Sequence, residues 1–277
     1  MCHMKKTFRL LIILTVFCSC SDQKKETNFE KEDTELIKDE PIFNPVAYVA
    51  NPAPIDEWCI SDINKAKAEI EKNGVVFTQA IGFGFGHERY EDELIKLCEE
   101  KGLKYKTDLI GCVVIDGQTQ GCYGAYMDKV LIDKYGKNFK KEMRTKADSL
   151  FLENAIKNNI AVYYGDCDER PKLPNRTNRY GIPSLNVSNI DIKEDKSDYG
   201  GWPFFDVGFI VERDSTISNI HINSFVASLE SNEKYKDQLF ELVTENIKTK
   251  YPNWVPGVVN GVQVRTDNNV RIYTVRE

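Results

Sequence analysis

PNWVPGVVNGVQVRTDNNVRIYTV, residues 252–275, combines two turn signals with a long alternating run. From position 262 onward the even-numbered side chains are mostly apolar or β-branched, and the odd-numbered ones are mostly polar or charged. Side chains of a strand point alternately to opposite faces, so this period of two predicts a long strand with one buried face. That face holds Val262, Val264, Thr266, Asn268, Val270, Ile272 and Thr274.

The segment before this run predicts a hairpin. Residues 205–212 and 217–224 are rich in β-branched and aromatic side chains, and residues 213–216 separate them as a tight turn.

A helix is predicted over residues 235–251. Its apolar stripe is Leu239, Leu242, Val243 and Ile247. Pro252 ends the helix, because the residue before a proline disfavours the helical conformation. The order strand, strand, helix, strand predicts a two-layer domain over residues 201–277, in which an antiparallel sheet of about three strands packs on one helix.

Seven residues of this domain have a spacing found in a known family. They are Pro252, Trp254, Pro256, Gly257, Asn260, Gly261 and Val264. The spacing P-x-W-x-P-G-x-x-N-G-x-x-V resembles the signature of TonB C-terminal-like domains, and the resemblance covers residues 202–277. Residues 209–217 also resemble the first hairpin of that family, with Ser215 in place of the usual glycine.

Each part of the signature has a physical reason. Asn260-Gly261 suits a type I′ turn, which needs two positive φ angles. Pro256-Gly257 suits a type II turn. Trp254 supplies one large ring to fill a small core.

The resemblance implies a way of binding. A TonB C-terminal domain pairs with an extended segment of an outer-membrane transporter, so this domain is expected to bind an envelope protein or an extended peptide by strand addition. The strand over residues 262–275 would be the receiving edge if it is the last in the sheet. The edge residues would then be Val264, Val270, Ile272 and Thr274.

The chain departs from TonB-type energy transducers at its amino terminus. Those proteins have a transmembrane helix and a long Pro-rich spacer. Here Lys5, Lys6 and Arg9 precede a short apolar run over residues 10–17, which is typical of a signal peptide. A lipobox-like sequence follows, which predicts a signal peptide over residues 1–19 and lipid attachment at Cys20, with Cys18 as an alternative.

A flexible acidic tether is predicted over residues 20–54. Residues 21–40 carry four lysines against eight acidic residues and few hydrophobic ones, a composition that buries too little surface to fold. The expected protein is therefore a membrane-anchored lipoprotein of the bacterial cell envelope, periplasmic or at the outer membrane, with an accessory role in transport.

Residues 55–200 predict a mixed α/β domain of unknown role, so the fold class of the chain is α+β. Ser61 or Asp62 would cap a helix that ends at Gly74. The other elements expected are strands over 75–85, 109–115 and 160–164 and helices over 88–100, 123–135 and 139–156. Residues 165–201 are rich in Pro, Asn, Asp and Gly and form the expected domain boundary.

Five cysteines remain after the leader, namely Cys59, Cys98, Cys112, Cys122 and Cys167. Cys112 and Cys122 flank a turn-like segment and are a candidate disulfide, although spacing alone does not give the Cα separation that a bridge needs. Buried free thiols are an equally good interpretation.

Three features resemble parts of a phosphate-binding, catalytic or metal-binding site, but each lacks the other residues that such a site needs. Residues 82–87 alternate Gly and Phe but match neither a dinucleotide-binding loop nor a P-loop. Residues 166–169 place Cys167 among carboxylates, which raise rather than lower a thiol pKa. His87 and His221 lack the partners of a metal site. We therefore expect no catalytic residue, no metal and no cofactor.

The formal net charge of −6 disfavours a nucleic-acid partner, because no basic cluster is available to neutralise phosphates. Two other functions stay open. One is an envelope hydrolase or ligand-binding protein with its site in the middle domain. The other is a structural lipoprotein that forms a homodimer through its sheet edge.

Overall fold

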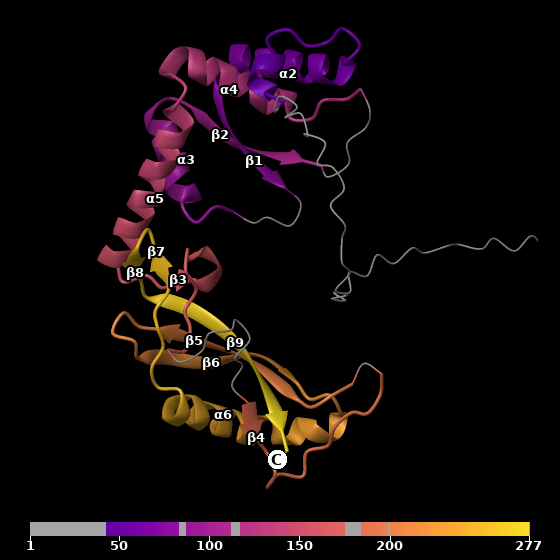
Figure 1. The fold of residues 1–277 in the computed structure, drawn as a ribbon, viewed down its shortest axis with the longest axis vertical. Helices are drawn as coiled ribbons and strands as arrows, with labels where there is room; N and C mark the ends of the chain where they lie inside the picture. The colour runs from indigo at the N-terminus through magenta and orange to yellow at the C-terminus, as the bar shows by residue number, and fades with distance from the viewer. Residues whose placement is uncertain (1–42, 83–86, 112–116, 175–183, 199, 277) are drawn as a thin grey trace, which may run out of the picture. The chain divides into compact units, whose positions relative to one another are not determined.

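The computed structural model describes residues 43–82, 87–111, 117–174, 184–198 and 200–276 (Figure 1). Residues 44–277 form one unit. The α+β class predicted from the sequence is confirmed. Within the described part of the chain, no helix has the length and apolar content that a membrane span requires.

The amino-terminal half of this unit is built from helices around two parallel strands. Its elements are α1 (Pro45–Tyr48), α2 (Glu57–Asn73), β1 (Val76–Gly82), α3 (Glu91–Glu100), β2 (Lys104–Ile110), α4 (Cys122–Tyr135) and α5 (Phe139–Lys157). β1 pairs with β2 from Val76 with Lys104 to Gly82 with Ile110. The helix α3 is the crossover that a parallel pair requires.

Local signals explain where the helices begin and end. Asp56 caps α2, because its carboxylate accepts from the Cys59 N–H at 3.1 Å. The predicted cap at Ser61 or Asp62 is therefore wrong. Gly74 ends α2 with φ +87°, as predicted.

Apolar side chains from α3, α4 and α5 pack against β1 and form the core of this half. The cluster contains Phe77, Leu94, Leu97, Cys98, Leu103, Leu131, Phe139, Met143 and Ala147. Burial raises the pKa of the Cys98 thiol to about 12, so this cysteine acts as a small hydrophobic residue.

The predicted tether extends too far. Residues 44–54 contain α1, and Val49 is only 3% exposed in a cluster with α2 and α4. The Tyr48 hydroxyl donates to Asp56 at 2.9 Å and holds this segment to the start of α2. Residues 1–42, including Cys20 and the predicted signal peptide, lie outside the described residues.

A disulfide joins Cys59 of α2 to Cys122 of α4, with the two Cα atoms 5.2 Å apart. The predicted pairing of Cys112 with Cys122 is therefore wrong. That prediction relied on closeness in the sequence, whereas packing of α2 against α4 brings together residues 63 positions apart. Cys112 lies outside the described residues.

The carboxyl-terminal half is built on a five-stranded sheet. Its strands are β3 (Val162–Tyr163), β4 (Ser184–Asn186), β5 (Phe204–Val211), β6 (Ile217–Val226) and β9 (Thr266–Val275). The order is β3-β9-β5-β6, and β4 also pairs with β9. The short helix η1 (Tyr164–Asp166) follows β3.

The predicted hairpin and helix are both present. β5 and β6 pair antiparallel, and Ser215 adopts φ +72° in the turn, which is the conformation that a glycine favours there. The helix η2 (Glu230–Tyr235) leads into α6 (Lys236–Lys250), which lies along one face of the sheet (Figure 1).

The core between α6 and the sheet uses most of the predicted stripe. Leu239, Val243 and Ile247 are buried, whereas Leu242 is 40% exposed and does not belong to it. Trp254 fills the end of this core, with its ring edge-on to Phe209 at 5.0 Å between centroids.

The long predicted strand is interrupted. β7 (Val258–Val259) and β8 (Val262–Gln263) form a separate small hairpin, and β9 begins at Thr266. Asn260 and Gly261 have φ +51° and +76°, as the predicted type I′ turn requires.

Removal of the disulfide by the double substitution Cys59→Ala and Cys122→Ala should lower the free energy of unfolding by about 2–4 kcal/mol, because a long loop of the denatured chain is released. Urea denaturation without reductant measures this difference, and wild type in reductant is the control. Peptide mapping without reductant should recover the Cys59–Cys122 cross-link. A Cys112–Cys122 cross-link would contradict the structure.

Candidate functional site

The strand predicted to receive a peptide lies inside the sheet. β9 pairs with β5 from Phe204 with Tyr273 to Val211 with Thr266. On its other side it pairs with β3 at its start and with β4 at its end. The prediction that this strand is the last in the sheet is therefore wrong, because β3 pairs with residues 266–267 and β4 pairs with residues 273–275. Residues 268–272, between these two pairings, have no partner on that side among the described residues.

The four predicted edge residues belong to the core side of the structure. Val264, Ile272 and Thr274 are buried, and Val270 is half-buried against the core. The Thr274 hydroxyl donates to the Pro203 carbonyl at 2.9 Å. These side chains hold the sheet together and do not present a binding surface.

Among the described residues, the order of this sheet ends on one side at β3, which has two residues, and on the other side at β6, which has ten. The partner of β6 is β5. Two irregularities interrupt the pairing of β6 with β5. At the first irregularity, Asn223 has no paired residue on β5. At the second, Asn219 adopts φ +49°. Both asparagines are exposed, and Val226 at the end of β6 is 40% exposed.

The polar face of the sheet is bonded across strands. Arg271 of β9 makes two hydrogen bonds to the Asp206 carboxylate, at 2.8 and 3.0 Å, and the Ser224 hydroxyl donates to the same carboxylate at 2.8 Å. The Arg271 hydrogen bonds lower the pKa of Asp206. The guanidinium also lies 4.2 Å from the centroid of the Phe204 ring. This ladder ties β6 and β9 to β5.

The residues of the TonB-like signature have local structural tasks. Trp254 donates from Nε1 to the Tyr251 carbonyl at 3.1 Å, and its N–H donates to Ser215 O at 2.9 Å, which fixes the hairpin turn to the core. Pro256 is buried, whereas Pro252 is exposed at the end of α6.

Glycine is required at position 257 for a reason other than the predicted type II turn. Its φ is not positive, so Pro256-Gly257 is not a type II turn. A Cβ at position 257 would lie 2.6 Å from Cys167 Sγ and 2.7 Å from Thr266 Oγ1. The Gly257 N–H donates to Thr266 Oγ1 at 3.0 Å. Glycine is needed because these two side chains approach its backbone closely.

Asn260 takes part in an ion network that sequence reasoning missed. Arg89, just before α3, makes two hydrogen bonds to Asp148 of α5, at 2.7 and 2.9 Å. It also donates to Asp168 at 2.6 Å and to the Asp166 carbonyl at 2.8 Å. Asn260 donates from its backbone to Asp168 at 2.6 Å and from its side chain to Asp148 at 2.8 Å.

This network changes the titration of its members. Burial raises the pKa of Asp148, but the hydrogen bonds from Arg89 and Asn260, with the charge of Arg89, together lower it by more. The net pKa is therefore below its ordinary value of 3.8. Burial also raises the pKa of Asp168, and hydrogen bonds from Arg89 and the Asn260 N–H together bring it below the ordinary value. Donors and acceptors are matched within the network, so its role is to hold the β7–β8 turn and the residue 166–169 loop to α3 and α5.

The other predicted chemistry does not assemble into a site. Cys167 is buried, and burial raises the pKa of its thiol. His87 pairs with Glu91, and the His221 ring contacts the Asn219 carbonyl at 2.9 Å. Residues 83–86 lie outside the described residues. In the described ranges, no group of three or more His, Cys, Asp or Glu side chains is arranged to hold a metal ion.

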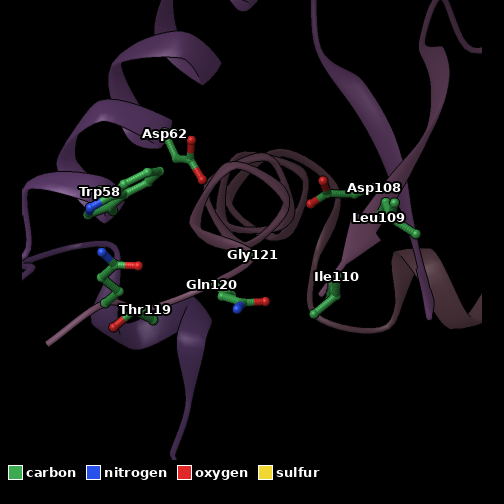
Figure 2. Close-up of a pocket in the computed structure, with 9 residues that line it drawn as sticks. Trp58, Asp62, Asp108, Leu109, Ile110, Thr119, Gln120 and Gly121 are labelled. Atoms are coloured by element: carbon green, nitrogen blue, oxygen red, sulfur yellow. The ribbon is translucent and has the colours of Figure 1, made fainter. Parts of the chain in front are cut away.

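A cavity of about 170 Å³ lies between α2, the end of β2 and the segment that leads into α4 (Figure 2). It is lined by Trp58, Asp62, Asp108, Leu109, Ile110, Gln118, Thr119, Gln120 and Gly121. Sequence reasoning did not select any of these residues as a site. The signal available in the sequence was the pair Leu109 and Ile110, two apolar residues at the end of β2.

Comparisons with protein-family models, with curated proteins and with solved structures found no match to this chain. The function argued below therefore depends on the residues and geometry of the chain itself.

Gly257→Ala should lower the free energy of unfolding by about 1–3 kcal/mol, because the added methyl group overlaps Cys167 Sγ and Thr266 Oγ1. Urea denaturation measures the loss. The double variant Gly257→Ala with Cys167→Ala lacks one of the two overlapping atoms. Its loss of unfolding free energy should therefore be smaller than the sum of the losses in the two single variants. Strictly additive losses would contradict the close approach.

Arg89→Met should lower the free energy of unfolding by about 2–4 kcal/mol at pH 7, because it leaves partly buried carboxylates without their cation. Denaturation with Lys137→Met, at an exposed position, is the control. A loss no larger than that of the control would show that the network does not stabilise the fold.

The stability difference between wild type and Arg89→Met should depend on pH. The lowered pKa values of Asp148 and Asp168 give stability that is present above their ordinary value of 3.8 and is lost as pH falls through the lower folded values. The stability difference between wild type and Arg89→Met should therefore shrink below pH 3.8. A difference that stays constant down to pH 2 would contradict this assignment.

Proposed function

We propose that the chain is a lipid-anchored protein of the bacterial cell envelope that binds a partner protein, through an extended segment of it, by strand addition at β6. The observation that carries this proposal is the position of β6 at the end of the sheet order, with its pairing to β5 on one side. An unpaired strand edge offers main-chain donors and acceptors to an incoming strand.

The irregularities of β6 limit how long the added strand is. Pairing with β5 holds at residues 217–218, 221–222 and 224–226, and the two irregularities separate these three stretches. Bulges twist an edge and are a known protection against uncontrolled edge pairing. The expected partner therefore adds a short strand next to the exposed end at Val226.

The side chains around this edge favour a polar segment with one apolar residue. Val226 is the exposed apolar side chain at the end of β6, and Asn219 and Asn223 are exposed polar ones. Ile220, Ile222 and Phe225 are packed against the core, so β6 keeps its shape without a partner.

The proposed lipid anchor and tether would favour local binding. Lipid attachment at Cys20 would leave about 20 residues before the folded unit, and a flexible tether of that length has a root-mean-square reach of ~25 Å. That reach suits capture of a partner close to the same membrane. It does not suit force transmission across the envelope, so an accessory role in TonB-dependent transport is the proposed context.

A second function is favoured by the same edge. Two copies could join their β6 strands across a two-fold axis and make a homodimer with a continuous sheet. The test must therefore separate a foreign partner from a second copy.

Asn223→Pro should abolish partner binding at β6, because proline removes the backbone N–H and restrains the edge. Asn223 has no pairing partner on β5, so the fold should persist, and circular dichroism checks this. Asn223→Ala is the matched control, since it loses the hydrogen bond to Asn269 but keeps the backbone N–H.

The measurement is affinity capture from envelope extracts with the three proteins in parallel, followed by sedimentation of each protein alone. Capture by wild type and Asn223→Ala but not by Asn223→Pro supports a foreign partner. Loss of a dimer only in Asn223→Pro supports self-association. Equal capture and equal sedimentation of all three would remove β6 as the binding edge.

A further inference from the structure

The cavity beside Trp58 lies at a place where parallel sheets bind ligands. β1 and β2 run parallel, and Asp108, Leu109 and Ile110 are the last residues of β2. In α/β units, ligands bind outside the carboxyl ends of parallel strands, because the loops and helix starts there converge. The cavity occupies this position, between the end of β2 and the start of α4.

The walls of the cavity are held at a fixed distance. Trp58 precedes Cys59 and Gly121 precedes Cys122, so the disulfide joins the two walls one residue away from the cavity. Asp56 also accepts from the Thr119 N–H at 3.2 Å, which ties the segment before α4 to the start of α2. A preformed cavity loses less entropy when a ligand binds.

The cavity combines exposed apolar side chains with two carboxylates. Trp58 is 66% exposed and Leu109 is 58% exposed, so both offer apolar surface to a ligand. Asp62 of α2 and Asp108 of β2 point toward one another across the cavity (Figure 2). The two come from different elements. Asp62 has Lys65 beside it, and Asp108 has Lys106, Lys140 and the Gly124 N–H nearby.

The existing contacts of the carboxylates leave room for a cation. Asp62 accepts from Lys65 at 2.9 Å on the exposed side of α2. Burial and the charge of Asp62 raise the pKa of Asp108, while Lys106 and the Gly124 N–H lower it by smaller amounts. The negative potential between the two carboxylates is therefore only partly compensated.

We propose that this cavity binds an organic cation, a primary ammonium or guanidinium group on a short apolar body. The charged group would lie between Asp62 and Asp108, and the apolar body would contact the Trp58 ring and Leu109. Carboxylates and an indole face are the groups that attract such cations. The volume is below the roughly 300 Å³ of sites for larger ligands, so the ligand is the size of one lysine or arginine side chain.

Calorimetric titration of the full chain at pH 7 with n-butylammonium chloride tests the proposal. n-Butanol is the matched neutral probe, and sodium butyrate is the matched anionic probe. A blocked lysine, N-acetyl-lysine N-methylamide, distinguishes a basic side chain of a peptide from a free amine as the source. Saturable binding of either cation, with weaker or absent binding of butanol and butyrate, is the expected result.

Substitutions locate the site. Asp62→Asn and Asp108→Asn should each weaken the binding of the cation by about threefold to fivefold, the scale of a partly solvated ion pair. Glu71→Gln, on the same helix but outside the cavity, should leave it unchanged. Butanol binding as tightly as butylammonium, no saturable binding of either cation, or affinities unchanged in both Asp variants would overturn the proposal. None of these outcomes depends on β6.

Discussion

Main-chain pairing of β9 on both of its sides is the constraint on which the carboxyl-terminal half depends. β5 occupies one side of β9, and β3 and β4 occupy the two ends of the other. Because β3 and β4 pair with the two ends of β9, the long end strand of the sheet is β6. The alternation in the sequence of β9 serves this position, since Thr266, Ile272 and Thr274 are buried while Arg271 bonds to Asp206 on the polar face.

The loops around β9 are held by short polar contacts together with a buried apolar cluster of Ala155, Val162, Cys167, Val259 and Val264. Thr266 Oγ1 accepts from the Gly257 N–H, and Cys167 lies against the same glycine. Close by in the sequence, Asn260 and Asp168 enter the network around Arg89. The signature residues are therefore explained by packing and loop attachment, and the proposed binding would depend on the β6 edge and on the cavity beside Trp58.

Local patterns predicted local structure well. The hairpin of β5 and β6, the helix α6 and the Asn260-Gly261 turn follow from alternation, helical spacing and turn chemistry, each of which acts over a few residues. The errors involve contacts between distant residues. Three residues of β4 and two of β3 are too few to give a periodic signal, yet they pair with the two ends of β9. Cys59 and Arg89 find their partners only through the packing of helices.

The disulfide between α2 and α4 also bears on when the amino-terminal half reaches its final form. Thiols stay reduced in the bacterial cytosol and oxidise after export. Under the proposed export, the Cys59–Cys122 disulfide beside Trp58 would form only after the chain leaves the cytosol, and until then α2 and α4 would be held by packing alone. Oxidation would act as a maturation step that sets the walls of the cavity, so its recognition properties would belong to the exported form of the protein.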